Sequence, residues 1–538
     1  MGDLSLLCLF IFLVPGFLSQ SADEWIEQAE EALQKALHLQ TLNTNEAKNV
    51  LMFIGDGMGI ATVTSARILK GQLQGNTGEE TVLNMESLPH VALSKTYNTD
   101  SQVGDSAGTA TAFLCGVKTK VGVLGVHNGA IKGDCHSSLN ASVDSVLKLA
   151  LDAGKSVGVV TTTRITHATP AAAYAHTPNR EWESNNKIPI EERLHGCRDI
   201  ALQLVEDGGR DFQVLLGGGR RDFLRITQRD PEHDMKFGSR TDGLDLIEEW
   251  KKNRPYSSKS SYVWNKKDFD KVNPETTDYL LGLFEHDHMQ YDANREEDIA
   301  GEPSLSEMVE KAIKMLKKNK NGFFLLVEGG RIDHSHHLNI AYHALKDTLA
   351  FDDALATAMS LTNSIDTLTI VTADHSHVNT IAGYPSRGNP ILGINDKKKG
   401  LDDLPYTTIM YTNGPGAKAV IASLNETGQR PNVTGVDTEA KTYVQQALVP
   451  KKDETHGGED VTIYADGPMA HLFHGVHEQH YIAHVIKYAS CLGNSTEHCN
   501  KVHLDTRSSY SDSSGAETAK CLKYFILFMT ISFHQLYT

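Results

Sequence analysis

The chain has 538 residues, of which 40% are hydrophobic and 22% are charged, so its composition is that of an ordinary globular protein. This excludes a largely disordered or collagen-like chain, and the length is enough to bury a sizeable core. The net charge of −17 argues against nucleic acid as a partner. With 25 His and 7 Cys, a metal site is expected to use imidazole and carboxylate ligands.

The chain begins with a short apolar segment, Leu4 to Leu18, followed by small and polar residues. The pattern predicts a secretory signal peptide over residues 1–20, although Asp3 and the absence of Lys or Arg ahead of the segment are unusual for one. The alternative is a buried N-terminal strand or helix. Residues 23–40 then place apolar side chains at helical spacing, which predicts an amphipathic helix that packs on its own body or on a second subunit.

The C-terminal end carries small residues around Ser508–Ala516, a polar stretch, and an apolar run from Tyr524 to Phe533. This pattern predicts a glycosylphosphatidylinositol anchor signal, with residues 514–538 removed, and the apolar run is too short for a transmembrane helix. A C-terminal strand or an amphipathic tail is the alternative. The anchored chain would lie on the extracellular face of the cell membrane. The candidate attachment residues are Asp512, Ser513, Ser514 and Gly515.

Secretion makes the cysteines candidates for disulfide bonds. Two of the seven lie in the removable segments, and the other five cannot all pair with one another. We expect one bridge across a short C-terminal loop, a second bridge, and one buried free thiol in an apolar run. The expected bridges are Cys491 with Cys499 and Cys135 with Cys197, and the free thiol is Cys115. Four sequons suit a secreted glycoprotein, at Asn140, Asn425, Asn432 and Asn494.

Five apolar runs of strand length alternate with helix-like stretches. The alternation predicts an α/β fold with a large, mostly parallel sheet that is buried on both faces and flanked by helices. Function in such sheets gathers at the carboxyl ends of the strands. Three of the runs end in acidic residues, and buried carboxylates that converge on one edge require cations. The runs are 49–54, 156–160, 212–216, 323–327 and 367–371, and the helix-like stretches include 305–318 and 341–361.

Residues 383–450 differ from the rest, because they are rich in Gly, Pro, Asn, Asp and Lys and show no long helical pattern. This composition predicts a small, irregular, β-rich insertion domain of the crown-like type, packed on the main domain. The α/β catalytic domain would then consist of residues 41–382 and 451–500.

Three segments concentrate residue types that bind metals. Val327–His337 contains two carboxylates and three imidazoles, and Asp333 and His337 would share one face of a helix because they are four residues apart. Residues 373–377 and 456–460 add further His, Asp and Glu side chains. Oxygen and nitrogen ligands at strand ends predict a metal cluster, and two close metals would clamp the attacking and leaving oxygens of a phosphoryl transfer.

Ser106 is the candidate nucleophile. It is flanked by small residues and precedes a helix-like stretch, Thr109–Cys115. A serine at a helix N-terminus gains from free backbone N–H groups that can hold an anion. The alternative is a plain N-cap serine.

Six motifs, in this order along the chain, resemble those of the alkaline phosphatases, and within them the animal type with a glycolipid anchor. The resemblance extends from about residue 49 to 499 and implies a phosphate monoesterase of broad substrate range. It also implies a homodimer, in which the helix at 23–40 would contact the partner subunit. The motifs are Phe53–Gly59, Asp105–Thr111, His167–Pro170, Val327–His337, Thr372–Ser376 and Thr455–Asp460.

The resemblance also implies roles for individual residues. Ser106 matches the nucleophile that becomes phosphoserine, Arg180 matches the phosphate clamp, and Asp105 and His167 accompany them. Two zinc ions, one magnesium ion and one calcium ion per subunit are implied. The implied ligands are Asp333, His337 and His456 for one zinc; Asp56, Asp374 and His375 for the other; and Asp56, Thr169 and Glu328 for magnesium.

The implied calcium site departs from the family pattern. Glu232, Glu285 and the carbonyl of Phe284 match three ligands, but the fourth is normally an Asp where this chain has Glu302. The loop 287–301 is also about two residues longer than the family pattern, and the longer arm of Glu changes the geometry of a calcium ligand.

Other functions fit the sequence less well. Sulfatases of the same superfamily need a Cys/Ser-x-Pro-x-Arg signature, which Ser106 and its neighbours lack. Related phosphodiesterases lack the third metal site, for which Thr169 and Glu328 argue here. A non-catalytic surface protein would have lost a ligand or the nucleophile, and none of the matched residues is missing.

Overall fold

A computed structural model describes residues 22–38, 42–494 and 499 of the chain. The predicted signal peptide, the anchor residues Asp512–Gly515 and the tail 514–538 lie outside the described residues. Among the helices that are described, none combines the length and apolar character needed to cross a bilayer.

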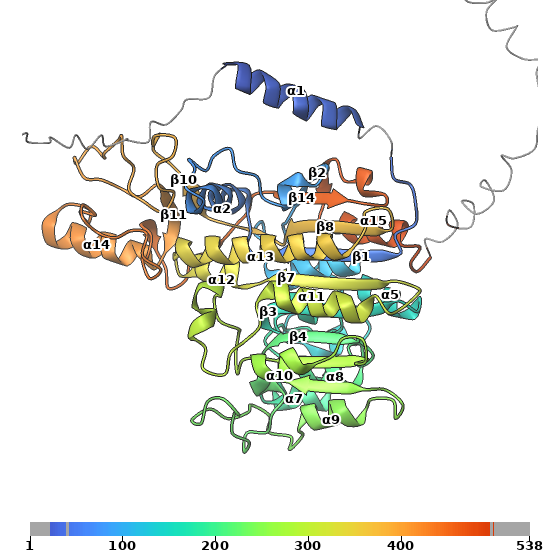
Figure 1. Ribbon diagram of the computed structural model, residues 1–538. Coiled ribbons are helices and arrows are strands. Elements are labelled where there is room, and N and C mark those ends of the chain that lie inside the picture. Colours follow the sequence, from blue (N-terminus) through green and yellow to red (C-terminus); the bar gives the residue numbers. More distant parts are fainter. Residues whose placement is uncertain (1–21, 39–41, 495–498, 500–538) are drawn as a thin grey trace, which may run out of the picture.

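One ten-stranded sheet runs through the centre of the molecule (Figure 1). Its neighbouring strands pair in parallel, except that β14 is antiparallel to both of its neighbours. The five predicted runs are β1, β3, β4, β7 and β8, so the predicted α/β fold with a mostly parallel sheet is confirmed. The strands, in sheet order, are β15 (Gly475–Glu478), β2 (His90–Lys95), β14 (Val461–Asp466), β8 (Thr367–Ala373), β1 (Asn49–Gly55), β7 (Phe323–Gly329), β3 (Ser156–Arg164), β4 (Val214–Gly218), β6 (Tyr279–Leu283) and β5 (Ser260–Val263).

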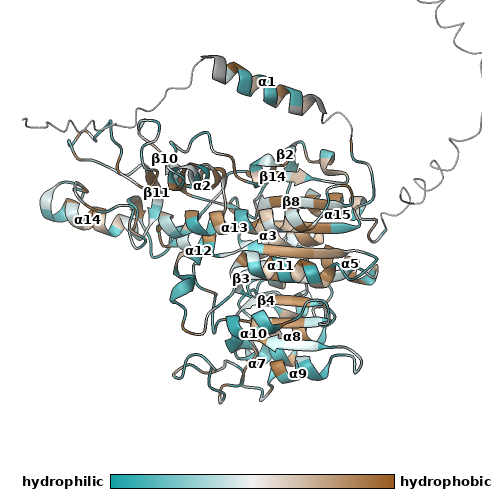
Figure 2. Cartoon of the chain, viewed as in Figure 1, coloured by the Kyte–Doolittle hydropathy of each residue, from teal (hydrophilic) through white to brown (hydrophobic). Residues whose placement is uncertain are grey.

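Side chains of the central strands alternate between two hydrophobic cores. In β1, Val50 and Met52 join the core on one face, and Leu51 and Phe53 join the core on the other. The sheet is therefore buried on both sides, which is why its strands read as unbroken apolar runs and are brown in Figure 2.

Helices cover both faces of the sheet. The predicted helices at 305–318 and 341–361 are confirmed as α11 and α13, and α11 ends two residues earlier than expected. The helix predicted at 23–40 is confirmed as α1. The helices are α1 (Ala22–His38), α2 (Ile60–Leu73), α3 (Ser106–Ala110), α4 (Cys135–Ser138), α5 (Val146–Asp152), α6 (Ala168–Ala171), α7 (Ile190–Leu194), α8 (Ile200–Glu206), α9 (Leu246–Lys252), α10 (Lys266–Lys271), α11 (Leu305–Leu316), α12 (Arg331–His337), α13 (Ala341–Leu361), α14 (Gly416–Thr427) and α15 (Tyr481–Ala489).

The region predicted as an irregular insertion forms a small sheet of β10 (Asn379–Ile381), β11 (Ile409–Gly414) and β12 (Ala447–Pro450). The expectation that residues 383–450 lack a long helix is wrong, because α14 spans 12 residues there. Gly428 ends this helix in the left-handed conformation, with φ 73°. In Figure 1, α14 projects from one end of the molecule.

The predicted cysteine pairing is confirmed. Cys135 is bonded to Cys197, and Cys491 is bonded to Cys499. Cys115 is a buried free thiol, and burial raises its pKa to about 12, so it stays protonated.

Candidate active site

The site lies where the central strands end. Asp56 follows β1, Glu328 lies in β7, and Asp374 and His375 follow β8. The registers Ile54↔Glu328 and Gly55↔Ala373 bring these ends to one edge of the sheet. All four side chains are fully buried, so their charges need partners.

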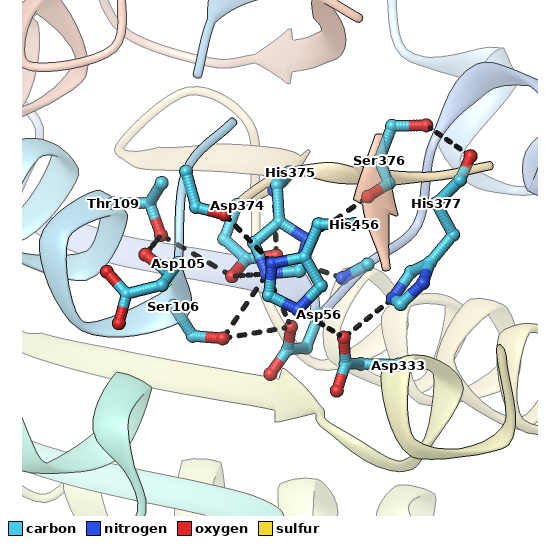
Figure 3. Close-up of polar contacts among 12 residues, drawn as sticks. Asp56, Asp105, Ser106, Thr109, Asp333, Asp374, His375, Ser376, His377 and His456 are labelled. Atoms are coloured by element: carbon cyan, nitrogen blue, oxygen red, sulfur yellow. Dashed lines mark hydrogen bonds and ion pairs between the residues drawn. The ribbon is translucent and has the colours of Figure 1, made fainter. Parts of the chain in front are cut away.

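Ser106 is the first residue of α3, and the preceding Asp105 caps the helix. The Asp105 carboxylate accepts a hydrogen bond from the Gly108 N–H at 3.1 Å, so the alternative of a plain N-cap serine does not apply. The Ser106 hydroxyl is therefore free to face the metal-ligand residues, 3.5 Å from Asp56 Oδ1 and 3.3 Å from His375 Nε2 (Figure 3). The expected helix of residues 109–115 begins earlier, at Ser106, and continues after α3 as one π-helical turn.

Asp56, Asp374 and His375 form one compact group of possible metal ligands. His375 Nε2 lies 3.0 Å from Asp374 Oδ2 and 3.5 Å from Asp56 Oδ1. Burial and then the neighbouring carboxylate of Asp374 raise the pKa of Asp56 well above its ordinary value. Burial opposes ionisation of Asp374 as well, but His375 lowers the pKa of that carboxyl to about 2. Together with Ser106, these carboxylates would hold a cation beside the hydroxyl.

A second group consists of Asp333, His337, His377 and His456. The predicted helical placement of Asp333 and His337 is confirmed, because both lie on α12, with His337 Nε2 3.3 Å from Asp333 Oδ2. His337 Nδ1 donates to the Glu454 carbonyl, and His456 Nδ1 donates to the Gly104 carbonyl. Their Nε2 atoms therefore carry lone pairs, and these face each other at 3.2 Å. Two facing lone pairs beside a carboxylate fit a bound metal ion.

A third group joins Asp56, Glu328 and His167, and Thr169 lies two residues after His167, in α6. Burial raises the pKa of Glu328 to about 7. Each of the four side chains has a buried polar atom without a hydrogen-bond partner among the described residues. These atoms are Asp56 Oδ2, Glu328 Oε1, Thr169 Oγ1 and His167 Nδ1. Orphaned oxygens of this kind suit a hard cation such as magnesium.

Arg180 supplies a cation next to the serine. Its guanidinium donates to Asp105 Oδ2 at 3.2 Å and lies 3.1 Å from His167 Nε2. Although burial opposes it, Arg180 lowers the pKa of Asp105, which stays ionised. Two N–H groups of one planar guanidinium can grip two phosphoryl oxygens.

Two residues of the site were given no individual role from the sequence, although His377 lies in the expected segment 373–377. His377 contacts Asp333 Oδ1 at 2.6 Å through Nε2 and Glu454 Oε2 at 2.5 Å through Nδ1. Glu454 also accepts from the Val378 N–H at 2.7 Å. Pairing of β9 (Ser376–His377) with β13 (His456–Gly457) brings these segments together. A signal was present, since His377 lies two residues after His375, but its partner Glu454 comes from a distant loop.

The residues implied for calcium lie elsewhere, after β6. Glu232 and Glu285 are brought together with Asp298, which was not among the implied ligands. Glu302 is close to this group, because burial and then the charges of Glu285 and Asp298 raise the pKa of its carboxyl well above the ordinary value, and its Oε2 has no hydrogen-bond partner among the described residues. Burial and the adjacent Glu232 raise the pKa of Asp298 to about 7. Phe284 is buried next to Glu285.

An open cleft of about 680 Å³ leads from the surface to the serine side of the site. Asp105, His337 and His456 line its inner end, and Lys451 and Lys452 line its rim.

The chain matches the family model described as alkaline phosphatase over residues 47–492. It is 53% identical over 478 residues to the tissue-nonspecific alkaline phosphatase of Rattus norvegicus, which spans 88% of this chain and 90% of that one. The tissue-nonspecific enzyme of Homo sapiens is 52% identical over 495 residues, with 91% and 93% covered. An alkaline phosphatase of Gadus morhua is 50% identical over 483 residues, with 89% and 99% covered.

Solved structures agree in fold. Thermus thermophilus alkaline phosphatase superposes with a TM-score of 0.60 at 26% identity, covering 88% of this chain and 99% of that one. The enzyme of the Antarctic bacterium TAB5 gives a TM-score of 0.57 at 24% identity, covering 84% and 100%. The chain therefore belongs to the alkaline phosphatase family of phosphate monoester hydrolases.

Proposed function

We propose that the chain hydrolyses phosphate monoesters in two displacements at Ser106. In the first, the Ser106 Oγ attacks phosphorus, the ester P–O bond breaks, and the alcohol leaves with a proton. In the second, water attacks the phosphoserine, and inorganic phosphate departs as the serine hydroxyl is restored. The observation that carries this proposal is the Ser106 hydroxyl, which faces Asp56 and His375 from the start of a helix capped by Asp105.

Three metal ions fit the site. One zinc ion would be held by each of the first two groups of ligands, and magnesium by the group with orphaned oxygens. When bound, these ions supply Lewis acidity to the serine hydroxyl, the leaving oxygen and the attacking water. The proposed ligands are Asp333, His337 and His456 for one zinc; Asp56, Asp374 and His375 for the other; and Asp56, Thr169 and Glu328 for magnesium. A structural calcium ion near Glu232, Phe284 and Glu285 belongs to the same proposal.

The side chains divide the remaining work. Arg180 would bind the phosphoryl oxygens opposite the metal ligands, and Asp105 and His167 hold its guanidinium in place. Asp105 also accepts from the Gly122 N–H at 3.0 Å, which fixes this carboxylate between loop and helix. Because the cleft is open, we expect substrates to be recognised by their phosphate, and the range of alcohols to be broad.

Trapping the intermediate tests the mechanism. Incubation with labelled phosphate at low pH should leave the label on a peptide that contains Ser106, because acid slows the second step, in which water must lose a proton. The Ser106→Ala variant should carry no label and keep at most slow hydrolysis by direct water attack. Label on another residue, together with wild-type rates in Ser106→Ala, would contradict the proposal.

We further infer that the protein is an extracellular glycoprotein held by a lipid anchor and assembled as a homodimer. The two disulfides suit an oxidising compartment, and all four sequon asparagines are exposed. On α1, Trp25, Ile26 and Leu33 are each about half exposed, an apolar stripe that a second subunit would cover.

Two measurements test this assembly. Phosphatidylinositol-specific phospholipase C should release activity from intact cells, and activity that stays on the membrane after complete digestion would rule out the anchor. Sedimentation should give a dimer, whereas a fully active monomer at nanomolar concentration would exclude one.

A further inference from the structure

A cavity lies in the insertion region, between helix α14 and the small sheet that contains β11 and β12. Its volume is about 510 Å³, which is enough for a small organic molecule. The lining residues come from α14, β11 and β12, from the loop at 400–406, and from the segments next to these elements. None of them lines the open cleft that leads to Ser106, so the cavity is separate from the candidate active site.

The wall of the cavity is mainly apolar. Met410 of β11, Val420 of α14 and Leu448 of β12 line it, and the protein leaves part of each side chain uncovered. Leu401 also lines it and is fully exposed, which places this side chain at the rim. An apolar molecule in the cavity would remove this surface from water, and such burial is favourable.

Two tyrosines of the wall contribute their rings rather than their hydroxyl groups. The Tyr411 hydroxyl lies 2.7 Å from Nδ1 of His336, and the Tyr406 hydroxyl accepts from Nδ2 of Asn395 at 3.5 Å. His336 and Asn395 do not line the cavity, so both hydroxyl groups have partners outside it. The two rings therefore add to the apolar surface.

The charged groups of the wall neutralise each other. Arg430 donates to both carboxylate oxygens of Asp402, from Nε at 2.8 Å and from Nη2 at 2.7 Å. The same guanidinium donates to the carbonyls of Leu404 and Pro405. Among the described residues that line the cavity, no other side chain is charged. A charged ligand would have to compete with this closed pair, so the wall favours a neutral one.

One polar group of the wall has no partner. Gln446 is 9% exposed, and neither Nε2 nor Oε1 makes a hydrogen bond with the described residues. Gln446 directly precedes β12 and is two residues from Leu448, so the two side chains share the face of the strand that borders the cavity. A buried amide without partners is costly, and a ligand with one donor and one acceptor would satisfy it.

A small molecule suits this cavity better than a protein partner does. The proposed glycosylation sites include Asn425, which lies in α14, and Asn432, which follows Arg430 by two residues. Both asparagines are exposed. Glycans at these positions would obstruct a folded partner, whereas a small molecule could still enter.

We propose that this cavity binds one neutral, largely apolar small molecule whose polar group, such as an amide, pairs with the side chain of Gln446. Its apolar body would cover Met410, Val420 and Leu448. This site is additional to the proposed hydrolysis. Its readout is binding, so it can be tested whether or not Ser106 is the nucleophile.

The probe is N-phenyl-1-naphthylamine, which is neutral, carries one N–H donor and becomes fluorescent in apolar surroundings. Enzyme loaded with zinc and magnesium would be titrated with it. We expect saturable binding that Val420→Trp weakens at least tenfold, because the indole would fill the cavity. Ile421→Trp is the control, since Ile421 is the next residue of α14 and does not line the cavity, and it should keep binding within about twofold. Equal binding by the wild type and Val420→Trp would overturn the proposal.

A second pair of variants applies if Val420→Trp fails to fold. Leu448 is mostly exposed, so Leu448→Trp should fold and also lose at least tenfold in affinity. Val449→Trp, on the other face of β12, should keep binding within about twofold. Retained binding in Leu448→Trp would contradict the proposal. A second copy of the chain in the cavity would appear as no saturable binding in the wild type, together with dissociation of the dimer in Val420→Trp, and would also overturn it.

Two related probes test the chemistry of the ligand. 8-Anilinonaphthalene-1-sulfonate is the same ring system with a sulfonate, and we expect the binding that Val420→Trp removes to be at least tenfold weaker for it. Equal or tighter binding of the sulfonate would rule out a preference for neutral ligands.

The role of the amide is tested with 1-benzylnaphthalene, in which CH₂ replaces the N–H, measured by competition with the first probe. Gln446→Leu should lower the affinity for the amine, relative to that for the hydrocarbon, about fivefold, as for the loss of one hydrogen bond. An unchanged ratio would show that Gln446 does not contact the ligand.

Discussion

At the scale of single residues, the site is organised around one carboxylate, Asp333. His337, His377 and His456 each approach it within 3.4 Å, and each is oriented by a partner on its other ring nitrogen. For His337 and His456 the partner is a backbone carbonyl, so these rings keep a lone pair for a metal. His377 is instead held between two carboxylates, which favours its charged form. The partner of the Nδ1 atom thus decides whether an imidazole of this site is a candidate metal ligand or a charged ring between two carboxylates.

Arg180→Lys should weaken phosphate binding. The guanidinium of Arg180 contacts Asp105 and His167, and we propose that it also binds two phosphoryl oxygens. An ammonium group cannot reproduce this planar set of N–H donors. We expect KM and the inhibition constant of inorganic phosphate to rise about tenfold, as for the loss of one charge-assisted hydrogen bond worth roughly 1.5 kcal/mol or more. Arg193→Lys, an exposed change on α7, is the control. An unchanged inhibition constant would show that Arg180 does not contact phosphate.

His377 should make the metal-free protein less stable at alkaline pH. Burial opposes its charge, but Glu454 and Asp333 raise its pKa to about 10 from an ordinary value of 6.5. The charged ring therefore stabilises the folded state fully below pH 6.5, and this contribution declines with rising pH and is lost above about 10. Urea unfolding from pH 6 to 10 should show a smaller decline in His377→Gln. His195→Gln, which alters a mostly exposed ring, should keep the wild-type slope.

At the scale of elements, short segments after the strands position the chemistry. The turn after β1 needs Gly57, which has φ 70° and whose added Cβ would lie 2.4 Å from the ring of His377. The two-stranded pairing of β9 with β13 places His377 opposite His456. Helix α12 sets Asp333 and His337 one turn apart. These elements are short, and their geometry is held mainly by the buried contacts of the site.

Helix α11 is stabilised at its start by a reciprocal pair of hydrogen bonds. Ser304 Oγ accepts from the Glu307 N–H at 3.2 Å, and Glu307 accepts from the Ser304 N–H at 2.8 Å. Ser304→Ala should therefore lower the free energy of unfolding by about 1 kcal/mol. Ser306→Ala, two residues into the same helix, should have a smaller effect in the same denaturant titration. Equal effects would mean that the cap contributes nothing.

At the scale of the whole molecule, the acidic chain needs local cations to bind an anionic substrate. The net charge is −17, yet Arg180 is at the site, and Lys451 and Lys452 are at the rim of the cleft. Metal ions at the strand ends would add to this local positive field. The overall charge is therefore negative, while the local field at the site is set by a few cationic groups.

The two disulfides should differ in their contribution to stability. Cys135 and Cys197 are 62 residues apart, and Cys491 and Cys499 are 8 apart. Loop-closure entropy then predicts a loss of about 4 kcal/mol on replacing the first pair by serine and about 2.5 kcal/mol for the second. Thermal unfolding of the two double variants measures the order. A larger loss for the C-terminal pair would show that strain or contacts in the folded state outweigh loop length.

The sequence by itself determined the α/β class, the five central strands and the short-loop disulfide Cys491–Cys499, and it indicated candidate ligand residues at strand ends and one helical turn apart. These features are local, because an apolar run or an i, i+4 spacing has the same meaning wherever the chain goes. Helix α14 was missed because glycine- and proline-rich flanks masked a 12-residue helical stretch. Only the tertiary structure joined His377 to Glu454 and brought Asp298 to Glu232 and Glu285. Such pairings depend on the path of long loops, which local sequence patterns do not specify. They matter for stability because a buried charge without a partner is costly.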